Sequence, residues 1–178
     1  MAALKVSTSG RLLSLDIVEG HDAVSSAKKL LKSRSITGGI STWDASSIFF
    51  EMNNLEVDDK PSPRTLVLLY AADLFFRLRW EIVPALDEGK CVVAAPYIET
   101  AYAFGAVSGL PKQWLTEVFR FAPAPSESFR ANGDSSAKLG VATTGFVEFC
   151  SSILGQDLRP KFVEYFDDLE RRGACRSI

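Results

Sequence analysis

Apolar residues recur at helical spacing between Leu66 and Leu86, near the middle of the chain. Gly89 follows this segment and is expected to stop the helix. The next apolar run, Cys91 to Ala95, has the length of a strand that is buried on both faces of a sheet. A second helical pattern starts near Glu99. Helix, buried strand and helix in this order predict an α/β domain with a parallel sheet. The face of the first helix that is predicted to pack in the core comprises Leu69, Ala72, Phe76, Trp80, Val83 and Leu86.

The same patterns divide the rest of the chain into further elements. Strands are predicted at 12–18 and at 36–41, and helices at 23–33, 46–55, 111–121, 146–154 and 160–172. A strand at 123–130 is only weakly indicated, because this segment is polar. The polar segments 56–64 and 132–140 are predicted to be loops.

Composition and charge narrow the function classes. The 178 residues suffice for one domain with a substantial core, so residues 1–178 are predicted to form a single domain. A net charge of -2 gives no support for a nucleic-acid-binding surface. The chain contains no apolar run of the roughly 20 residues that a membrane span needs, and its N-terminus lacks the apolar core of a signal peptide. A cytoplasmic location without membrane attachment is therefore expected.

The cysteines do not suggest a metal site. Cys91, Cys150 and Cys175 are far apart in the sequence and form no C-x-x-C pair, and His21 is the only histidine. We expect three reduced thiols, with Cys91 packed in its strand, and no bound metal.

The central stretch also carries a family pattern. It reads LLYAAD from Leu68 to Asp73 and VPALDEG from Val83 to Gly89, and then continues with Ala95-Pro96-Tyr97 and with Phe104. This resembles the thymidylate kinase family, with its L-L-F-A-A-D-R-x-x-H helix, its x-P-A-L-x-x-G turn and its Asp-Arg-Tyr motif after the next strand. The resemblance extends over about residues 12–125. It implies a P-loop-kinase-like fold, with a parallel sheet of about five strands between layers of helices.

The segment expected to bind ATP phosphates departs from the family pattern. Family members carry E-G-x-D-G-x-G-K-[ST]-[ST] after the first strand. This chain keeps Glu19, Gly20 and Asp22, and Ser25 and Ser26 complete the remnant loop. Ala23 and Ser25 replace glycines, whose backbone would turn its N–H groups toward phosphate. Ser26 replaces the lysine that neutralises phosphate charge, and Ala27 replaces the hydroxyl that binds Mg²⁺. Lys28 is a weak candidate for the missing cation.

Charged residues are lost at further positions that the resemblance assigns to phosphate contacts. Trp43 replaces an arginine after the second strand, although Asp44 keeps the acidic residue beside it. Leu74 replaces the arginine after Asp73, and Ala95-Pro96 replaces the Asp-Arg pair. Arg77, one helical turn further on, could substitute for an arginine, or it could lie on the surface beside Trp80 or Phe76. Lys28, Asp73 and Arg77 are the only weak catalytic candidates.

Groups that would touch a nucleoside are better preserved. Tyr97 keeps the family's aromatic residue, Phe75 is predicted to stack on a pyrimidine, and Phe104 replaces a tyrosine. Gly105 stands where a glutamine is common, so amide recognition of the base is not expected. Filling of the core is an equally simple role for these aromatic residues. The candidate substrate-binding set is Trp43, Asp44, Asp73, Phe75, Arg77, Tyr97 and Phe104.

These observations leave three hypotheses. The first is a thymidylate kinase-like protein that has lost phosphotransfer. It would bind a nucleotide or another small molecule, or it would pair with a second copy of itself or with a related kinase. It would need no cofactor. The alternative is a divergent thymidylate kinase that uses Mg²⁺ and transfers the ATP γ-phosphate to dTMP, with Lys28, Asp73 and Arg77 in displaced roles. The third is an unrelated α/β domain. A nucleophile-elbow hydrolase is disfavoured, because the chain has no G-x-S-x-G motif.

Overall fold

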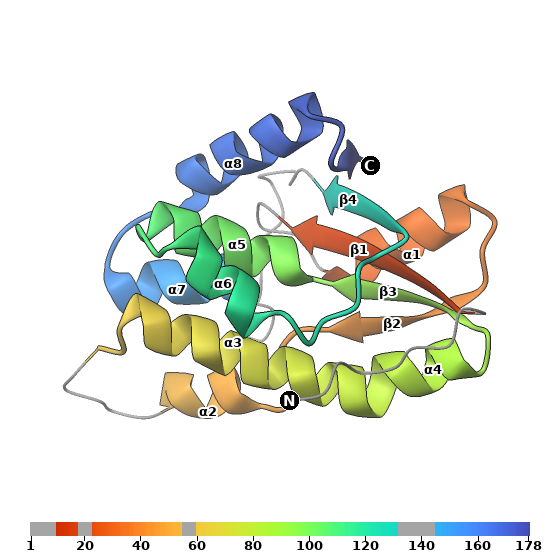
Figure 1. Cartoon of the computed structure of the whole chain (residues 1–178), viewed down its shortest axis with the longest axis horizontal. Coiled ribbons are helices and arrows are strands. Elements are labelled where there is room, and N and C mark those ends of the chain that lie inside the picture. The colour runs from red at the N-terminus through yellow and green to blue at the C-terminus, as the bar shows by residue number, and fades with distance from the viewer. Residues whose placement is uncertain (1–9, 18–22, 55–59, 132–144) are drawn as a thin grey trace.

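A five-stranded parallel sheet forms the centre of the computed structural model, which describes residues 10–17, 23–54, 60–131 and 145–178 (Figure 1). The strands are β1 (Arg11–Ile17), β2 (Gly38–Thr42), β3 (Cys91–Ala95), β4 (Glu127–Ala131) and β5 (Arg176–Ser177). Their order is β2-β3-β1-β4-β5, and every neighbouring pair is parallel. All five residues of β3 are buried, as their apolar run predicts. The predicted fold class is confirmed.

Helices cover both faces of this sheet. They are α1 (Ala23–Ser33), α2 (Ile48–Asn54), α3 (Pro63–Arg77), α4 (Val83–Asp87), α5 (Ile98–Val107), α6 (Lys112–Val118), α7 (Phe146–Leu154) and α8 (Arg159–Arg171). Alternate strand residues point to opposite faces. Leu13 and Val93 pack with α1 in one core, while Leu12 and Val92 belong to the larger core that α3, α5, α7 and α8 share. Within the described segments, no helix combines the length and the apolar character that crossing a bilayer requires.

The predicted central helix is continuous from α3 to α4 and runs along the lower edge of the molecule in Figure 1. Ser62 caps its start by accepting a hydrogen bond from the backbone of Thr65. A π-helical segment, Leu78–Ile82, joins the two parts. It ends two residues before Pro84, which has no N–H to donate within the helix. The helix ends at Gly89, which has a φ of 77°, so this predicted stop is confirmed.

The predicted core face of this helix is wrong at Ala72, Phe76 and Trp80, whereas Leu69 and Val83 pack against the core and Leu86 is buried in it. Ala72, Phe76 and Trp80 are exposed, and Trp80 retains 65% of its accessible surface. The buried residues of the helix are Leu66, Val67, Tyr70, Ala71, Asp73, Leu74, Arg77, Leu78, Ile82 and Leu86. The error arises because the segment is apolar on most sides, so two faces of the helix fit helical spacing. The face that is buried carries the charged residues Asp73 and Arg77, which made it look exposed.

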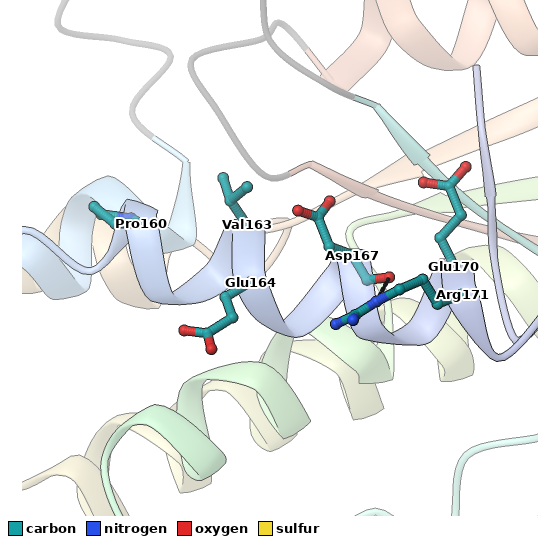
Figure 2. Close-up of a pocket in the computed structure, with 6 residues that line it drawn as sticks. All are labelled: Pro160, Val163, Glu164, Asp167, Glu170 and Arg171. Carbon is teal, nitrogen blue, oxygen red and sulfur yellow. Dashed lines mark hydrogen bonds between the residues drawn. The ribbon is translucent and has the colours of Figure 1, made fainter.

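Strands β4 and β5 form from segments that have little or no strand pattern in their sequence. Arg130 of β4 is only 7% exposed, and its guanidinium lies 2.5 Å from an Asp167 oxygen and 2.8 Å from a Glu170 oxygen. Its Nε also donates to Ser177 of β5 at 3.1 Å. Figure 2 shows Val163, Asp167 and Glu170 projecting from one side of α8, where they help to line a pocket of about 630 Å³. Arg130 therefore ties both strands to α8.

The remaining predicted elements agree with the structure to within a few residues. These are β1, β2, α1, α2, α5, α6, α7 and α8. Cys91, Cys150 and Cys175 are all buried free thiols. The predicted loop at 132–140, including Lys138, and most of the loop at 56–64 lie outside the described residues.

Candidate functional site

The carboxyl ends of β1, β2 and β3 form the sheet edge to which the candidate residues were assigned. In open parallel sheets, ligands bind outside these strand ends. Of the remnant phosphate loop, Glu19, Gly20 and Asp22 lie outside the described residues. Ser25 and Ser26 lie in the first turns of α1, where Ser25 is exposed and Ser26 is buried. Lys28 is exposed on the same helix.

Asp73 holds the turn that follows β2. It is 1% exposed, and its carboxylate accepts hydrogen bonds from the backbone N–H of Asp44 at 3.0 Å and of Ser46 at 3.0 Å. The Ser46 hydroxyl donates to the same carboxylate at 2.8 Å. These donors satisfy a buried charge that would otherwise be costly. Asp73 therefore acts as an organiser of the turn.

Asp44 continues this arrangement into α2. Its carboxylate accepts hydrogen bonds from the backbone N–H groups of Phe49 and Phe50, each at 2.8 Å. Burial raises the pKa of Asp44, these hydrogen bonds oppose the rise, and the nearby charge of Asp73 adds to it. Asp44, the acidic residue that the family pattern retains, thus accepts hydrogen bonds from the first turn of α2.

Arg77 is fully buried and forms a fork between three acceptors. Its Nε donates to Ser41 Oγ at 3.0 Å, its Nη1 to the carbonyl of Pro96 at 2.9 Å, and its Nη2 to the carbonyl of Ser41 at 2.8 Å. The Ser41 hydroxyl in turn donates to Glu81 Oε2 at 2.6 Å. Among the described residues, no carboxylate lies within ion-pair distance of Arg77. The expected surface position is wrong, and the guanidinium connects α3 to β2 and to the turn after β3.

Asp16, near the end of the central strand, was missed by the sequence analysis. Its Oδ1 accepts hydrogen bonds from the backbone N–H groups of Tyr97 at 3.0 Å and Thr100 at 3.1 Å, and from the Thr100 hydroxyl at 2.8 Å. It therefore caps the N-terminus of α5 from inside the sheet. Burial, together with the charge of Glu99, raises the pKa of Asp16 to about 7, although the hydrogen bonds oppose this. The available signal was an acidic residue inside the apolar run LLSLDIV.

The turn after β3 is held by backbone contacts. Tyr70 donates its hydroxyl to the carbonyl of Tyr97 at 2.7 Å, and the Tyr97 hydroxyl donates to the carbonyl of Pro123 at 2.7 Å. The backbone N–H of Trp43 donates to the carbonyl of Ala95 at 3.3 Å. Tyr97 is completely buried. Its aromatic ring therefore belongs to the core and presents no surface to a ligand.

An aromatic cluster centred on Phe146 of α7 includes two of the predicted substrate-binding residues, Trp43 and Phe104. The Phe146 ring lies 4.6 Å from Tyr70, 5.4 Å from Phe104 and 5.9 Å from Trp43, measured between ring centroids. Phe104 is completely buried. Phe75 is separate from this cluster and lies 5.5 Å from Phe121. Tyr70, rather than Phe75, is the aromatic residue of α3 that faces Phe104 across the cluster.

Gly105 brings α5 and α6 close together. A Cβ at this position would lie 2.4 Å from Cδ1 of Leu115, which is a steric overlap. The glutamine that is common in the family would therefore displace Leu115 from its present position. This supports the expectation that a base is not recognised through an amide here.

The described residues do not fit Mg²⁺ and ATP phosphates. Within the part of the chain that the structure describes, no group of three or more acidic, histidine or cysteine side chains is arranged to hold a metal ion. Asp16, Asp44 and Asp73 each accept backbone N–H donors, and Ala95 offers no polar side chain. The arrangement stabilises loops and helix ends, and we derive no phosphotransfer step from it.

A structural role of Arg77 predicts a loss of stability when it is replaced. Arg77→Met should lower the free energy of unfolding by about 3 kcal/mol, because three buried acceptors lose their donors. Urea denaturation followed by circular dichroism measures this. Arg79→Met, at an exposed position of the same helical segment, is the matched control and should change stability by less than about 0.5 kcal/mol. Equal midpoints for the two variants would contradict the structural role.

The raised pKa of Asp16 predicts a pH dependence of stability. The folded protein holds this proton up to about pH 7, while the unfolded chain releases it near its ordinary pKa of 3.8. The contribution of Asp16 to the free energy of unfolding is thus complete below pH 3.8 and is lost as the pH rises to about 7. Asp16→Asn, which keeps an acceptor oxygen, should remove this decline in urea midpoints between pH 4.5 and 8.

Asp157→Asn is the control for this measurement. Asp157 is exposed, and hydrogen bonds from Arg159 lower its pKa, so this variant should retain the decline. A decline of the same size in Asp16→Asn would show that another group causes it.

Comparison with known proteins agrees with the geometry of the fold. No family model matches the chain. The chain is 32% identical over 78 residues to a probable thymidylate kinase of Caldivirga maquilingensis, which is 44% of this chain and 38% of that relative. It is 38% identical over 58 residues to a probable thymidylate kinase of Pyrococcus abyssi, covering 33% of this chain and 28% of the relative. The matched segments thus span well under half of either relative.

The fold is shared over nearly the whole chain. The crystal structure of thymidylate kinase from Ehrlichia chaffeensis superposes with a TM-score of 0.60 at 14% identity, covering 95% of this chain and 90% of that one. The sheet order and the helical layers belong to the same fold. The resemblance predicted from the sequence is therefore confirmed: this chain is thymidylate kinase-like, with a short stretch of similar sequence inside a shared fold.

Proposed function

We propose that this protein is a thymidylate kinase-like protein that has lost phosphotransfer and acts by binding a nucleotide, another small molecule or a protein partner. The observation that carries this proposal is the fork of Arg77. An arginine that could have contacted a phosphate instead donates to Ser41 and to the carbonyl of Pro96, and it is fully buried. Asp73 is engaged in the same way by the turn after β2.

The physics of the reaction supports this proposal. Phosphoryl transfer depends almost wholly on positioning and on electrostatic stabilisation of the transferring group. Ser26 and Ala27 replace the lysine and the metal-side hydroxyl of the family pattern, and Leu74 replaces an arginine. Ala95 and Pro96 replace the acidic and basic pair. The protein therefore needs neither ATP nor Mg²⁺, and we propose that it works in the cytoplasm as a single domain.

The alternative is a divergent thymidylate kinase. Its support is the shared fold, which extends over 95% of this chain. In this alternative, Lys28 would supply the cation for the ATP phosphates. Lys28 is exposed on α1, so it is free of the internal contacts that engage Arg77.

Calorimetric titration of the purified protein with ATP-Mg²⁺, and separately with dTMP, distinguishes the two functions. We expect no saturable heat with ATP, while the thymidylate kinase of Ehrlichia chaffeensis serves as the positive control. Micromolar ATP binding that Lys28→Ala abolishes, together with formation of dTDP, would overturn the proposal in favour of the kinase. Binding of dTMP alone would identify a nucleotide ligand for the non-catalytic protein.

We further propose that the protein forms a homodimer through the exposed apolar residues of its central helix. Leu68, Phe76 and Trp80 are 51%, 39% and 65% exposed, and their spacing places them along one side of the helix. We call this surface the α3 stripe. Contiguous exposed apolar residues of this size are typical of protein–protein contacts. Pairing with a related kinase through the same stripe is the alternative.

Sedimentation velocity tests the homodimer. The protein should sediment as a dimer at micromolar concentration, and Trp80→Glu should convert it to a monomer, because the substitution places a charge in the apolar contact. Lys28→Glu, on α1 at the other face of the sheet, is the control and should remain dimeric. A wild-type protein that stays monomeric at 100-fold higher concentration would exclude the homodimer.

A further inference from the structure

A second cavity lies on the opposite side of α5 from the Phe146 cluster. It has a volume of about 510 Å³ and is bounded by α5, α6 and α8, which lie next to one another in Figure 1. The volume is within the range of ordinary small-molecule sites. The lining residues are Ile98, Glu99, Tyr102, Ala106, Leu110, Lys112, Leu115, Thr116, Tyr165, Leu169 and Arg172.

The walls of this cavity combine apolar and polar side chains, with aromatic rings from two helices. Tyr102 of α5 and Tyr165 of α8 contribute rings, and Leu115 and Leu169 contribute branched aliphatic groups. Such walls favour the apolar body of a ligand, because its burial removes apolar surface from water.

The charged side chains in the cavity differ in whether they already have a partner within the protein. The Tyr165 hydroxyl donates to Glu99 Oε2 at 3.1 Å, so the carboxylate already has a donor from within the protein. Burial raises the pKa of Glu99, and the positive charges of Lys112 and Arg172 oppose this rise, which places both cations near the same carboxylate. The cavity thus presents one engaged carboxylate and two cations.

The two cations differ in how strongly they are engaged. Arg172 forms an ion pair with Asp168 of its own helix. Lys112, the first residue of α6, has no carboxylate within ion-pair distance among the described residues. A lysine ammonium carries three donors and a full charge. Lys112 is therefore the lining residue best placed to receive an anion in this cavity.

We propose that this cavity binds a small amphipathic anion, with its aromatic or aliphatic body between Tyr102, Leu115 and Leu169 and its anionic group at Lys112. The site is separate from the carboxyl edge of the sheet and does not depend on the loss of phosphotransfer. A nucleoside triphosphate is a poor match, because its several negative charges would meet Glu99 and Asp168 as well as the two cations.

The test uses an anionic probe and its uncharged analogue. The probes are 8-anilinonaphthalene-1-sulfonate and N-phenyl-1-naphthylamine, which share an aromatic body and differ in the sulfonate. Equilibrium dialysis with the full chain should give one saturable site for the sulfonate. Lys112→Gln should weaken sulfonate binding about fivefold and leave binding of the uncharged probe unchanged, because it removes a partly exposed charge and little apolar surface.

Variants that fill the cavity test its location. Ala106→Phe, which fills the cavity from α5, should abolish binding of both probes. Thr116→Phe, which fills it from α6, should do the same, so the test stays valid if one variant fails to fold. Arg79→Met, at an exposed position outside the cavity, is the control and should leave both affinities unchanged. Unchanged sulfonate binding in a folded cavity-filling variant, or equal effects of Lys112→Gln on the two probes, would overturn the proposal.

Discussion

The buried guanidinium of Arg77 is the constraint on which the sheet edge depends. A cation without water is expensive unless every donor has a partner and the geometry is fixed. Here the partners are the hydroxyl and carbonyl of Ser41 and the carbonyl of Pro96, so one side chain fixes the ends of two strands against a helix. The hydrogen bond from Ser41 to Glu81 extends this network toward an exposed carboxylate. Movement of any of these segments would leave buried acceptors unpaired.

The carboxylates at the same edge have equivalent tasks. Asp73 and Asp44 organise the turn after β2 and the start of α2, and Asp16 caps α5. In each case the acceptor oxygens meet backbone N–H groups at the beginning of a turn or helix, where such groups otherwise lack partners. Among the described residues, this edge of the sheet is therefore a network of internal hydrogen bonds.

The sequence was sufficient for the fold and insufficient for the site. Apolar runs and helical spacing identified β1, β3 and most helices, because these elements are buried in a regular way. The central helix misled because its inward face carries Asp73 and Arg77 while Trp80 points outward. Strand β4 was indistinct because Arg130, a strand residue, is buried through partners on α8 that no local pattern reveals. The role of each polar side chain depended on contacts between residues distant in sequence, such as Asp16 and Thr100.

Helix α5 borders two different environments. One side carries Phe104 in the aromatic cluster, and the other carries Tyr102 and Ala106 in the cavity beside α6 and α8. Its N-terminus is attached to the central strand through Asp16. Any occupant that shifts or stiffens this helix alters the free energy of events on its other side, and thermodynamic linkage makes that influence equal in both directions. The helix is thus a shared wall through which an occupied cavity would alter the stability of the aromatic core, and a change in that core would alter binding in the cavity.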